Sequence, residues 1–550
     1  MNHHRYKPFP KVRLENRQWP GKEIHKAPIW CSVDLRDGNQ ALEVPMSLEK
    51  KLRFFHFLVE MGFKTIEIGF PAASETEYDF TRYLIDNNLI PDDVAIQVLT
   101  QSREHIIKRT FEALRGAPKA VVHLYNSTST MQRDIVFRFG KKECIDLAVF
   151  GAKMIRDEIE KDTSSTQWFV EYSPESFSQT EEDFAVEICD AVLDVWQPTI
   201  QNKAIINLPN TVEVASPNIF ADQVEYFCTH TQWREQIIVS IHPHNDRGTA
   251  VADAELGILA GADRVEGTLF GNGERTGNVD LVTVGMNMFM HGIDPELDFS
   301  DMNKIIEIYE ECTDLKVPVR HAWAGKLVFT AFSGSHQDAI KKGMARMKEN
   351  ADVWAVPYLP IDPKDVGRDY DPIIRINSQS GKGGVSFILD NYYGLVLPKS
   401  FQKDFGAMCT KVSDQRQSEL LPSELFRLFD DEYVNRMEPY KLISYKEESI
   451  GDSQAIVHAT IQTPEGTQNI SGNGNGLLDA FCDGLNKILE DKIRIRNYHQ
   501  HALESGSDSA AITYIEIVTD QGNTSLGSGI SSSVTKASLR AVLCAVNRCK

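Results

Sequence analysis

Two histidines, an aspartate and an asparagine are the residues of this chain best suited to hold a metal ion. His242 and His244 stand two residues apart in HPHND, so on a strand both imidazoles project to the same side. Asp37 follows an apolar run in DLRDG, and Asn278 in GNGERTGN could add an amide oxygen. This oxygen-rich set favours Mg²⁺ or Mn²⁺, with Zn²⁺ as an alternative. The pattern therefore predicts a divalent-metal site that keeps coordination positions for substrate and water.

Arg36, directly before Asp37, indicates what such a metal could do. A divalent ion can chelate a 2-oxo acid through its carboxylate and keto oxygens and polarise the carbonyl carbon toward attack. The Arg36 guanidinium would then stabilise the charge of an alkoxide or enolate. Other interpretations stay open at this point. The same residue types also serve as turn formers and ion pairs, and two histidines with one carboxylate form the facial triad of non-haem Fe(II) oxygenases.

The elements that must position these residues recur from residue 28 onward. Eight short apolar runs are each followed by a stretch with helical periodicity, which is typical of βα units. This number of parallel strands favours an α/β fold of the (β/α)8 TIM barrel type over an open doubly wound sheet, and places the chemistry at the C-terminal ends of the strands. The runs are 29–34, 65–69, 94–99, 120–125, 168–172, 204–208, 237–242 and 264–269.

Outside the barrel, predicted over 28–322, the pattern changes. Residues 1–27 are basic and contain prolines but no apolar stretch, which indicates an N-terminal arm and not a targeting peptide. Residues 323–430 mix helical stretches with Pro/Gly-rich connections, which predicts small helical linker subdomains. In residues 431–550, strand-like runs alternate with two helical stretches, each preceded by a Gly/Ser-rich turn (SGNGNG and GSGISS). This predicts an α+β module of two ββα halves.

Composition excludes several classes of protein. With 58 Lys and Arg against 78 Asp and Glu, the chain has a formal net charge of −20, which argues against nucleic acid or an anionic membrane as a partner. No apolar run is long enough to span a membrane. The nine cysteines form no CxxC pair, which indicates reduced thiols in a cytoplasm.

Several motifs together resemble the 2-isopropylmalate synthase family. The DLRDG and HPHND motifs are shared by a wider superfamily that includes homocitrate and citramalate synthases and hydroxymethylglutaryl-CoA lyase. The remaining motifs narrow the resemblance from this superfamily to the 2-isopropylmalate synthase family. It implies a Claisen-type condensation of acetyl-CoA with 2-oxoisovalerate and water to 2-isopropylmalate and CoA, with citramalate or homocitrate synthase as the alternative. The motifs are CSVDLRDGNQAL (31–42), the segment 242–281, FSGSHQDAIKKG (332–343), VPYLPIDPKDVGR (356–368) and RINSQSGKGG (375–384).

The resemblance implies a role for each of several residues in the barrel. The family's carbonyl-activating arginine matches Arg36. Residues that line the oxo-acid site match Glu171 and Thr211, and Leu99 and His123 would shape the pocket for the isopropyl group. Potassium activation is a further implied property. The metal positions of the family match Asp37, His242, His244 and Asn278.

Other implied roles lie outside the barrel. His336 and Tyr358 match the family's catalytic pair, which would act on the neighbouring protomer's site in a homodimer. Lys382 in SGKGG could meet the phosphates of CoA, or stand in an ordinary loop. The C-terminal module resembles a leucine-binding regulatory domain, in which the polar Ser509 replaces an expected small apolar residue. The implied leucine pocket comprises Leu478, Ile495, Tyr498, Ala502 and Ile530.

Overall fold

The computed structural model describes residues 9–331, 333–347, 353–370, 382–416, 420–450, 454–503 and 509–549. The chain divides into two compact units. The first comprises Met1–Val328 with Ile361–Asp369, and the second comprises Phe329–Pro360 with Tyr370–Lys550. None of the described helices is long and apolar enough to cross a membrane.

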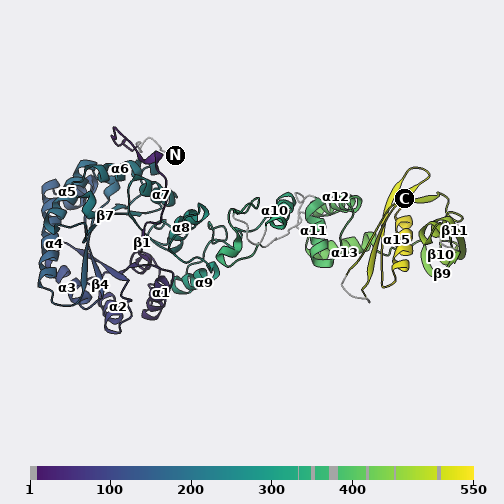
Figure 1. The fold of residues 1–550 in the computed structure, drawn as a ribbon, viewed down its shortest axis with the longest axis horizontal. Helices are drawn as coiled ribbons and strands as arrows, with labels where there is room; N and C mark the ends of the chain where they lie inside the picture. Colours follow the sequence, from purple (N-terminus) through teal and green to yellow (C-terminus); the bar gives the residue numbers. More distant parts are fainter. Residues whose placement is uncertain are drawn as a thin grey trace. The chain divides into compact units, whose positions relative to one another are not determined.

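The first unit is a closed barrel of eight parallel strands, in which β1 pairs with both β2 and β8 (Figure 1). The predicted TIM barrel is confirmed. The first strand ends earlier than predicted, because Asp34–Gly38 forms a π-helical turn, and the fifth continues three residues further. The strands are β1 (Ile29–Ser32), β2 (Thr65–Gly69), β3 (Ala95–Gln101), β4 (Lys119–Ser127), β5 (Gln167–Glu175), β6 (Ala204–Asn210), β7 (Ile237–Pro243) and β8 (Arg264–Gly267).

Amphipathic helices surround the strands and bury one face each against them. Several start at side-chain caps: Ser47 accepts from the Lys50 N–H at α1, and Ser74 accepts from the Glu77 N–H at α2. The helices are α1 (Leu48–Glu60), α2 (Glu75–Asp86), α3 (Glu104–Leu114), α4 (Lys141–Lys161), α5 (Glu182–Trp196), α6 (Pro217–His230), α7 (Ala250–Ala260), α8 (Leu281–Met290) and α9 (Met302–Thr313).

The N-terminal arm is held against α6 by buried carboxylates. Arg17 donates two hydrogen bonds of 2.6 Å to Asp222, and the Trp19 indole donates to the same carboxylate. Glu225 accepts the backbone N–H groups of Gln18 and Trp19. The described part of the arm is therefore anchored by charge-assisted hydrogen bonds.

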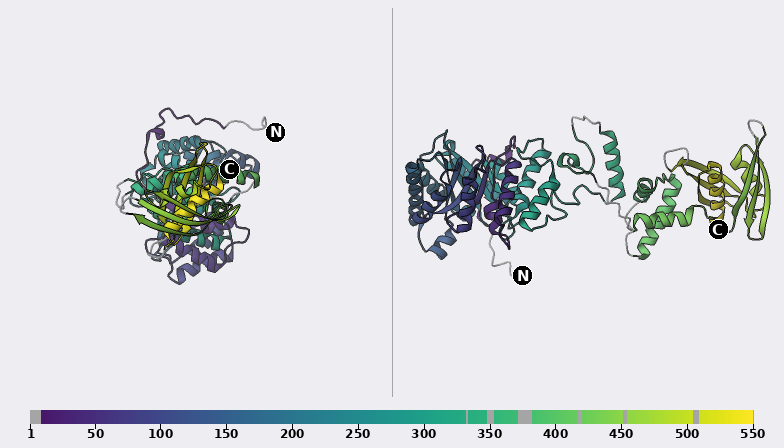
Figure 2. Two further views of the ribbon diagram at one scale, coloured as in Figure 1. Left: turned by 90° about the vertical axis from the view of Figure 1, so that its right-hand side faces the viewer. Right: turned by 90° about the horizontal axis from the view of Figure 1, so that it is seen from below.

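The second unit begins with helices and ends with two sheets. Figures 1 and 2 show α15 between the two three-stranded sheets, β11-β10-β9 and β12-β13-β14. A second core joins α11–α13 to the other face of β13 through Ile512 and Tyr514. The elements are α10 (Gly334–Arg346), α11 (Lys382–Tyr393), α12 (Lys399–Arg416), α13 (Pro422–Tyr433), β9 (Lys441–Ile450), β10 (Gln454–Thr463), β11 (Gly466–Gly474), α14 (Leu477–Leu485), β12 (Ile493–Ala502), β13 (Ala511–Thr519), β14 (Thr524–Ser531) and α15 (Val534–Arg548).

Each half of the C-terminal module is βββα, which corrects the predicted ββα pattern. Residues 471–474 and 527–531 of the Gly/Ser-rich segments are parts of β11 and β14, so most of each segment is strand and not turn. A Cβ atom on Gly472 would overlap the carbonyl oxygen of Ala480 in α14, and one on Gly529 would overlap that of Ala537 in α15. The glycines therefore let a helix backbone lie directly on a strand.

Candidate active site

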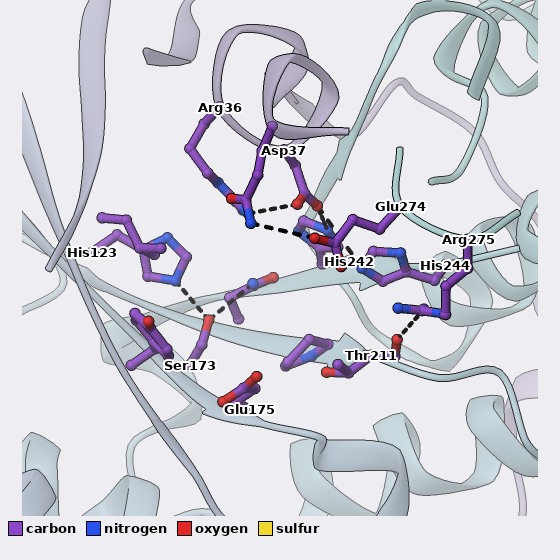
Figure 3. Close-up of a pocket in the computed structure, with 15 residues that line it drawn as sticks. Arg36, Asp37, His123, Ser173, Glu175, Thr211, His242, His244, Glu274 and Arg275 are labelled. Atoms are coloured by element: carbon purple, nitrogen blue, oxygen red, sulfur yellow. Dashed lines mark hydrogen bonds and ion pairs between the residues drawn. The ribbon is translucent and has the colours of Figure 1, made fainter. Parts of the chain in front are cut away.

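Asp37, His242 and His244 converge at the C-terminal mouth of the barrel (Figure 3). Asp37 comes from the π-helical turn after β1, and the histidines come from the end of β7. Asp37 Oδ2 lies 3.1 Å from His242 Nε2 and 3.8 Å from His244 Nε2. One ligand atom from each residue lies within 4.8 Å of the others. The predicted trio is thus brought to the spacing that a single metal ion requires.

Asn278 stands next to this trio. It forms a β-bridge with His244, and its Nδ2 donates to Asp37 Oδ2 over 3.1 Å. Asn278 Oδ1 and His244 Nδ1 are buried without a hydrogen-bond partner. A buried acceptor without a partner costs free energy, so an amide oxygen left in this state beside a carboxylate and two imidazoles fits a site that takes a cation.

Arg36 is the charged group that pairs with the carboxylate of the trio. Its Nη1 lies 2.7 Å from Asp37 Oδ1, and its Nε pairs with Glu67 of β2. Burial alone would raise the pKa of Asp37, but the Arg36 charge and the His242 contact outweigh it and hold that pKa well below its usual range. Asp37 is therefore ionised and able to bind a metal at neutral pH.

A buried polar network supports the histidine that faces Asp37. His242 Nδ1 lies 2.8 Å from Glu266 Oε2, which directs Nε2 toward Asp37. Glu266 also accepts from Gln97 and Asn207 and pairs with Arg264, which is almost fully buried. The orientation of His242 is thereby fixed from several strands of the barrel.

A cavity of about 210 Å³ opens beside the trio (Figure 3). Its wall includes the predicted residues Arg36, Leu99, His123 and Thr211, and so one cavity joins the metal trio to the expected oxo-acid residues. Residues not predicted also line it. They are Gln40, Tyr125, Ser173, Glu175, Asn207, Pro209, Glu274 and Arg275.

The structure places Glu171 differently from the prediction. Glu171 is fully buried, its Oε2 accepts from Arg264 over 3.0 Å, and it is not among the residues that line the cavity. Glu175, two pleats further along the same side of β5, lines the cavity together with Ser173. Of the two glutamates in EYSPES, the later one therefore faces the site. The alternation of strand side chains is the signal that could have found Ser173 and Glu175.

Three family models match consecutive parts of the chain. The HMGL-like model matches residues 27–308, which contain the barrel. The model described as alpha-isopropylmalate synthase, post-catalytic domain-like, matches residues 326–390. The LeuA allosteric (dimerisation) domain matches residues 419–550.

Full-length relatives share one name. A 2-isopropylmalate synthase of Acetoanaerobium sticklandii is 58% identical over 550 residues, which cover 100% of this chain and 97% of the relative. The chain belongs to the 2-isopropylmalate synthase family. Enzymes of that name from Clostridium acetobutylicum and Rhodospirillum rubrum are each 53% identical, covering 100% and 99% of this chain and 100% and 98% of the relatives. The family is one of metal-dependent acyltransferases that use acetyl-CoA.

The pair that resembles the synthase family's catalytic pair lies in the second unit. The rings of His336 and Tyr358 stack against each other, and both side chains are exposed. The side chain of Lys382 lies outside the described residues.

The five residues of the implied leucine pocket do not share one face. Ile495, Tyr498 and Ala502 of β12 lie opposite Ile517, Ile515 and Ala511, on the face of β13 that packs against α15. Leu478 of α14 packs on the same core. Ile530 lies opposite Ile512, on the other face, against the core shared with α11–α13. Within one protomer, four of these residues lie on one side of the sheet and Ile530 on the other.

Proposed function

We propose that this chain catalyses the condensation of acetyl-CoA with 2-oxoisovalerate and water, giving 2-isopropylmalate and CoA, the first committed step of leucine biosynthesis. The observation that carries the proposal is the placement of Asp37, His242 and His244 on one cavity that Arg36, Leu99 and Thr211 also line. Full-length similarity to 2-isopropylmalate synthases supports this choice over citramalate or homocitrate synthase.

The cavity lining offers both polar and apolar groups to a branched 2-oxo acid. Arg36 and Thr211 provide cationic and hydroxyl groups for the carboxylate and keto oxygens, while Leu99 and Pro209 provide apolar contacts for the isopropyl group. Burial would lower the pKa of Arg36, but Asp37 and Glu67 raise it above its usual value, so the guanidinium stays charged. Arg36 would therefore stabilise the negative oxygen that forms when the carbonyl carbon is attacked.

Mg²⁺ is the proposed cofactor, held by Asp37, His242, His244 and Asn278. Bound there, a divalent ion would act as a Lewis acid on the keto carbonyl. Carboxylate and amide oxygens support Mg²⁺ or Mn²⁺ over Zn²⁺, although the imidazoles also suit zinc. Activation by K⁺ is retained as a proposal from the family resemblance.

His336 and Tyr358 are proposed to remove the proton of the acetyl methyl group, whose carbon then forms the new bond to the keto carbon. A histidine can act as general base, and the phenol hydroxyl beside it can donate a hydrogen bond to the enolate oxygen. In a homodimer the pair would serve the partner's site, a proposal supported by the matched dimerisation domain.

Leucine is the proposed effector, bound by the C-terminal module. In the barrel, Glu171 is retained as a proposed residue beneath the oxo-acid site.

We also propose a division of the chain into an arm (1–27), a barrel (28–322), helical linker subdomains (323–430) and a regulatory domain (431–550). The three family matches support it in outline. Nine free cysteines support a cytoplasmic location.

The test is thiol release from acetyl-CoA with Mg²⁺ or Mn²⁺, across pyruvate, 2-oxobutyrate, 2-oxoisovalerate and 2-oxoglutarate, each with and without leucine. Preference for 2-oxoisovalerate with suppression by leucine is the expected result. Preference for pyruvate or 2-oxoglutarate would instead indicate a citramalate or homocitrate synthase.

A further inference from the structure

Two neighbouring loops at the mouth of the barrel are tied together by carboxylates. The β6 loop (residues 211–216) carries Thr211, and the β7 loop (residues 244–249) carries His244. The residue that makes most of the contacts between them is Glu213. It is 3% exposed and is not among the residues that line the cavity.

Glu213 holds the β7 loop at three points. Its carboxylate accepts the backbone N–H of Arg247 and the hydroxyl of Thr249. Its own N–H donates to Asp246 Oδ2 over 3.0 Å. Thr249 directly precedes α7, yet its hydroxyl bonds to Glu213 and does not cap the helix. The loop conformation after His244 is thus set by a side chain of the β6 loop.

Further hydrogen bonds connect the β7 loop to Thr211, the residue of the β6 loop that lines the cavity. Asp246 accepts from Arg275 Nε over 2.7 Å, and Arg275 Nη2 donates to the carbonyl oxygen of Thr211 over 2.6 Å. The His244 N–H donates to the carbonyl oxygen of Asn210, at the end of β6. Together these hydrogen bonds link Thr211 to His244 in a closed ring of contacts that includes Glu213.

We propose that Glu213 is a positioning residue, which fixes the β7 loop against the β6 loop and so sets the place of His244 relative to Thr211. Replacing the carboxylate by an amide would turn one of its two acceptor oxygens into an N–H₂ donor, which weakens the contact with Arg247 or Thr249 and frees the loop to shift. A shift of a metal ligand weakens metal binding and misplaces the oxo acid at once. The inference rests on the proposed metal site.

The test compares Glu213→Gln with the wild-type chain. Binding of Mn²⁺, measured by electron paramagnetic resonance without substrates, is expected to weaken by roughly 10- to 100-fold. The KM for 2-oxoisovalerate is expected to rise in the same variant. Thr249→Val removes one donor and keeps the carboxylate, and should weaken Mn²⁺ binding in the same direction but by less.

Glu225→Gln is the matched control. Glu225 is also 3% exposed and also accepts backbone N–H groups, but those of the N-terminal arm. The control should lower thermal stability and leave Mn²⁺ affinity unchanged. Mn²⁺ affinity within twofold of wild type in both Glu213→Gln and Thr249→Val would overturn the inference. A wild-type chain that binds no Mn²⁺ would overturn the proposed metal site itself.

Discussion

His336 and Tyr358 face each other with ring centroids 4.0 Å apart and 27° between the ring planes. Tyr358 has a positive φ of 65° and is 61% exposed. This backbone conformation, which non-glycine residues rarely adopt, holds the Tyr358 ring beside the His336 ring although neither side chain is packed into a core.

His336→Ala should therefore lower kcat by roughly 10²- to 10⁴-fold, because the proton of the acetyl methyl group loses its acceptor. Binding of 2-oxoisovalerate, measured by calorimetry, should remain within about twofold of wild type, since the oxo acid binds in the barrel. Lys342→Ala is the control on the same helix, where the side chain is 73% exposed. Unchanged turnover in His336→Ala would remove this residue from the mechanism.

Removal of the metal should abolish turnover reversibly. Dialysis against a chelator is expected to stop thiol release, and added Mg²⁺ or Mn²⁺ should restore it in the wild-type chain. His244→Ala should recover little activity at the same metal concentration, because one of three converging ligands is lost. Thiol release measured across a metal titration checks this, and full recovery in the variant would exclude His244 as a ligand.

The two glutamates of β5 should respond differently to substitution. Glu175→Gln should lower kcat/KM for 2-oxoisovalerate with little change in Tm, because the side chain lines the cavity. Glu171→Leu should lower stability by about 3 kcal/mol, because it leaves the buried Arg264 without one partner. Steady-state kinetics and thermal unfolding of both variants check this. The reverse pattern would place Glu171 at the substrate.

Stability should depend on pH through Asp253. Burial, with the nearby charge of Glu213, raises the pKa of this carboxyl to about 8. The unfolded chain loses the proton near pH 4, so wild-type stability falls by about 1.4 kcal/mol per pH unit between these values. Asp253→Asn lacks this dependence.

The stability of Asp253→Asn relative to wild type should therefore rise from pH 5 to pH 7 and level off above pH 8. The measurement is the difference between the two thermal midpoints at each pH. A difference between the two midpoints that stays constant over this pH range would show that Asp253 is ionised in the folded chain.

Leucine feedback is better tested by substitution than by truncation. Removing residues 431–550 would take Tyr433, Ile512 and Tyr514 out of the core that they share with Phe401 and Phe405, and expose that core. Tyr498→Ala changes a side chain that is 43% exposed. The leucine concentration for half inhibition should rise about tenfold or more, with the rate without leucine as the reference for each variant. An unchanged inhibition curve would exclude Tyr498 from the effector site.

The sequence was sufficient for the barrel and for the metal trio because both depend on local pattern. Parallel strands buried on both faces give continuous apolar runs, and residues just after such runs lie at one end of the barrel. The HxH spacing then places two imidazoles together without any knowledge of tertiary structure.

What the sequence could not provide depends on neighbours far along the chain. Glu171 and Glu175 point to the same side of β5, and only the position of Arg264, on β8, decides which of them is covered. The strand β9 was missed because most of its described side chains are exposed and, among them, only Leu442 and Tyr445 pack on the core, which is too few apolar residues for a clear alternation. From the sequence, Gly472 and Gly529 are interpreted as turn residues. In the structure they are glycines because a helix backbone packs directly on each of them.

The anchoring of the arm on α6 has a practical consequence for recombinant production. A chain that starts downstream of Trp19 would retain Asp222 and Glu225 but lose all the donors that Arg17, Gln18 and Trp19 supply to them. Two carboxylates buried on the side of the barrel would then have to be rehydrated or protonated. Shortened versions should thus show poorer yield and heat tolerance while their turnover per folded molecule stays normal, so trimming this end to aid crystallisation should stop before Arg17.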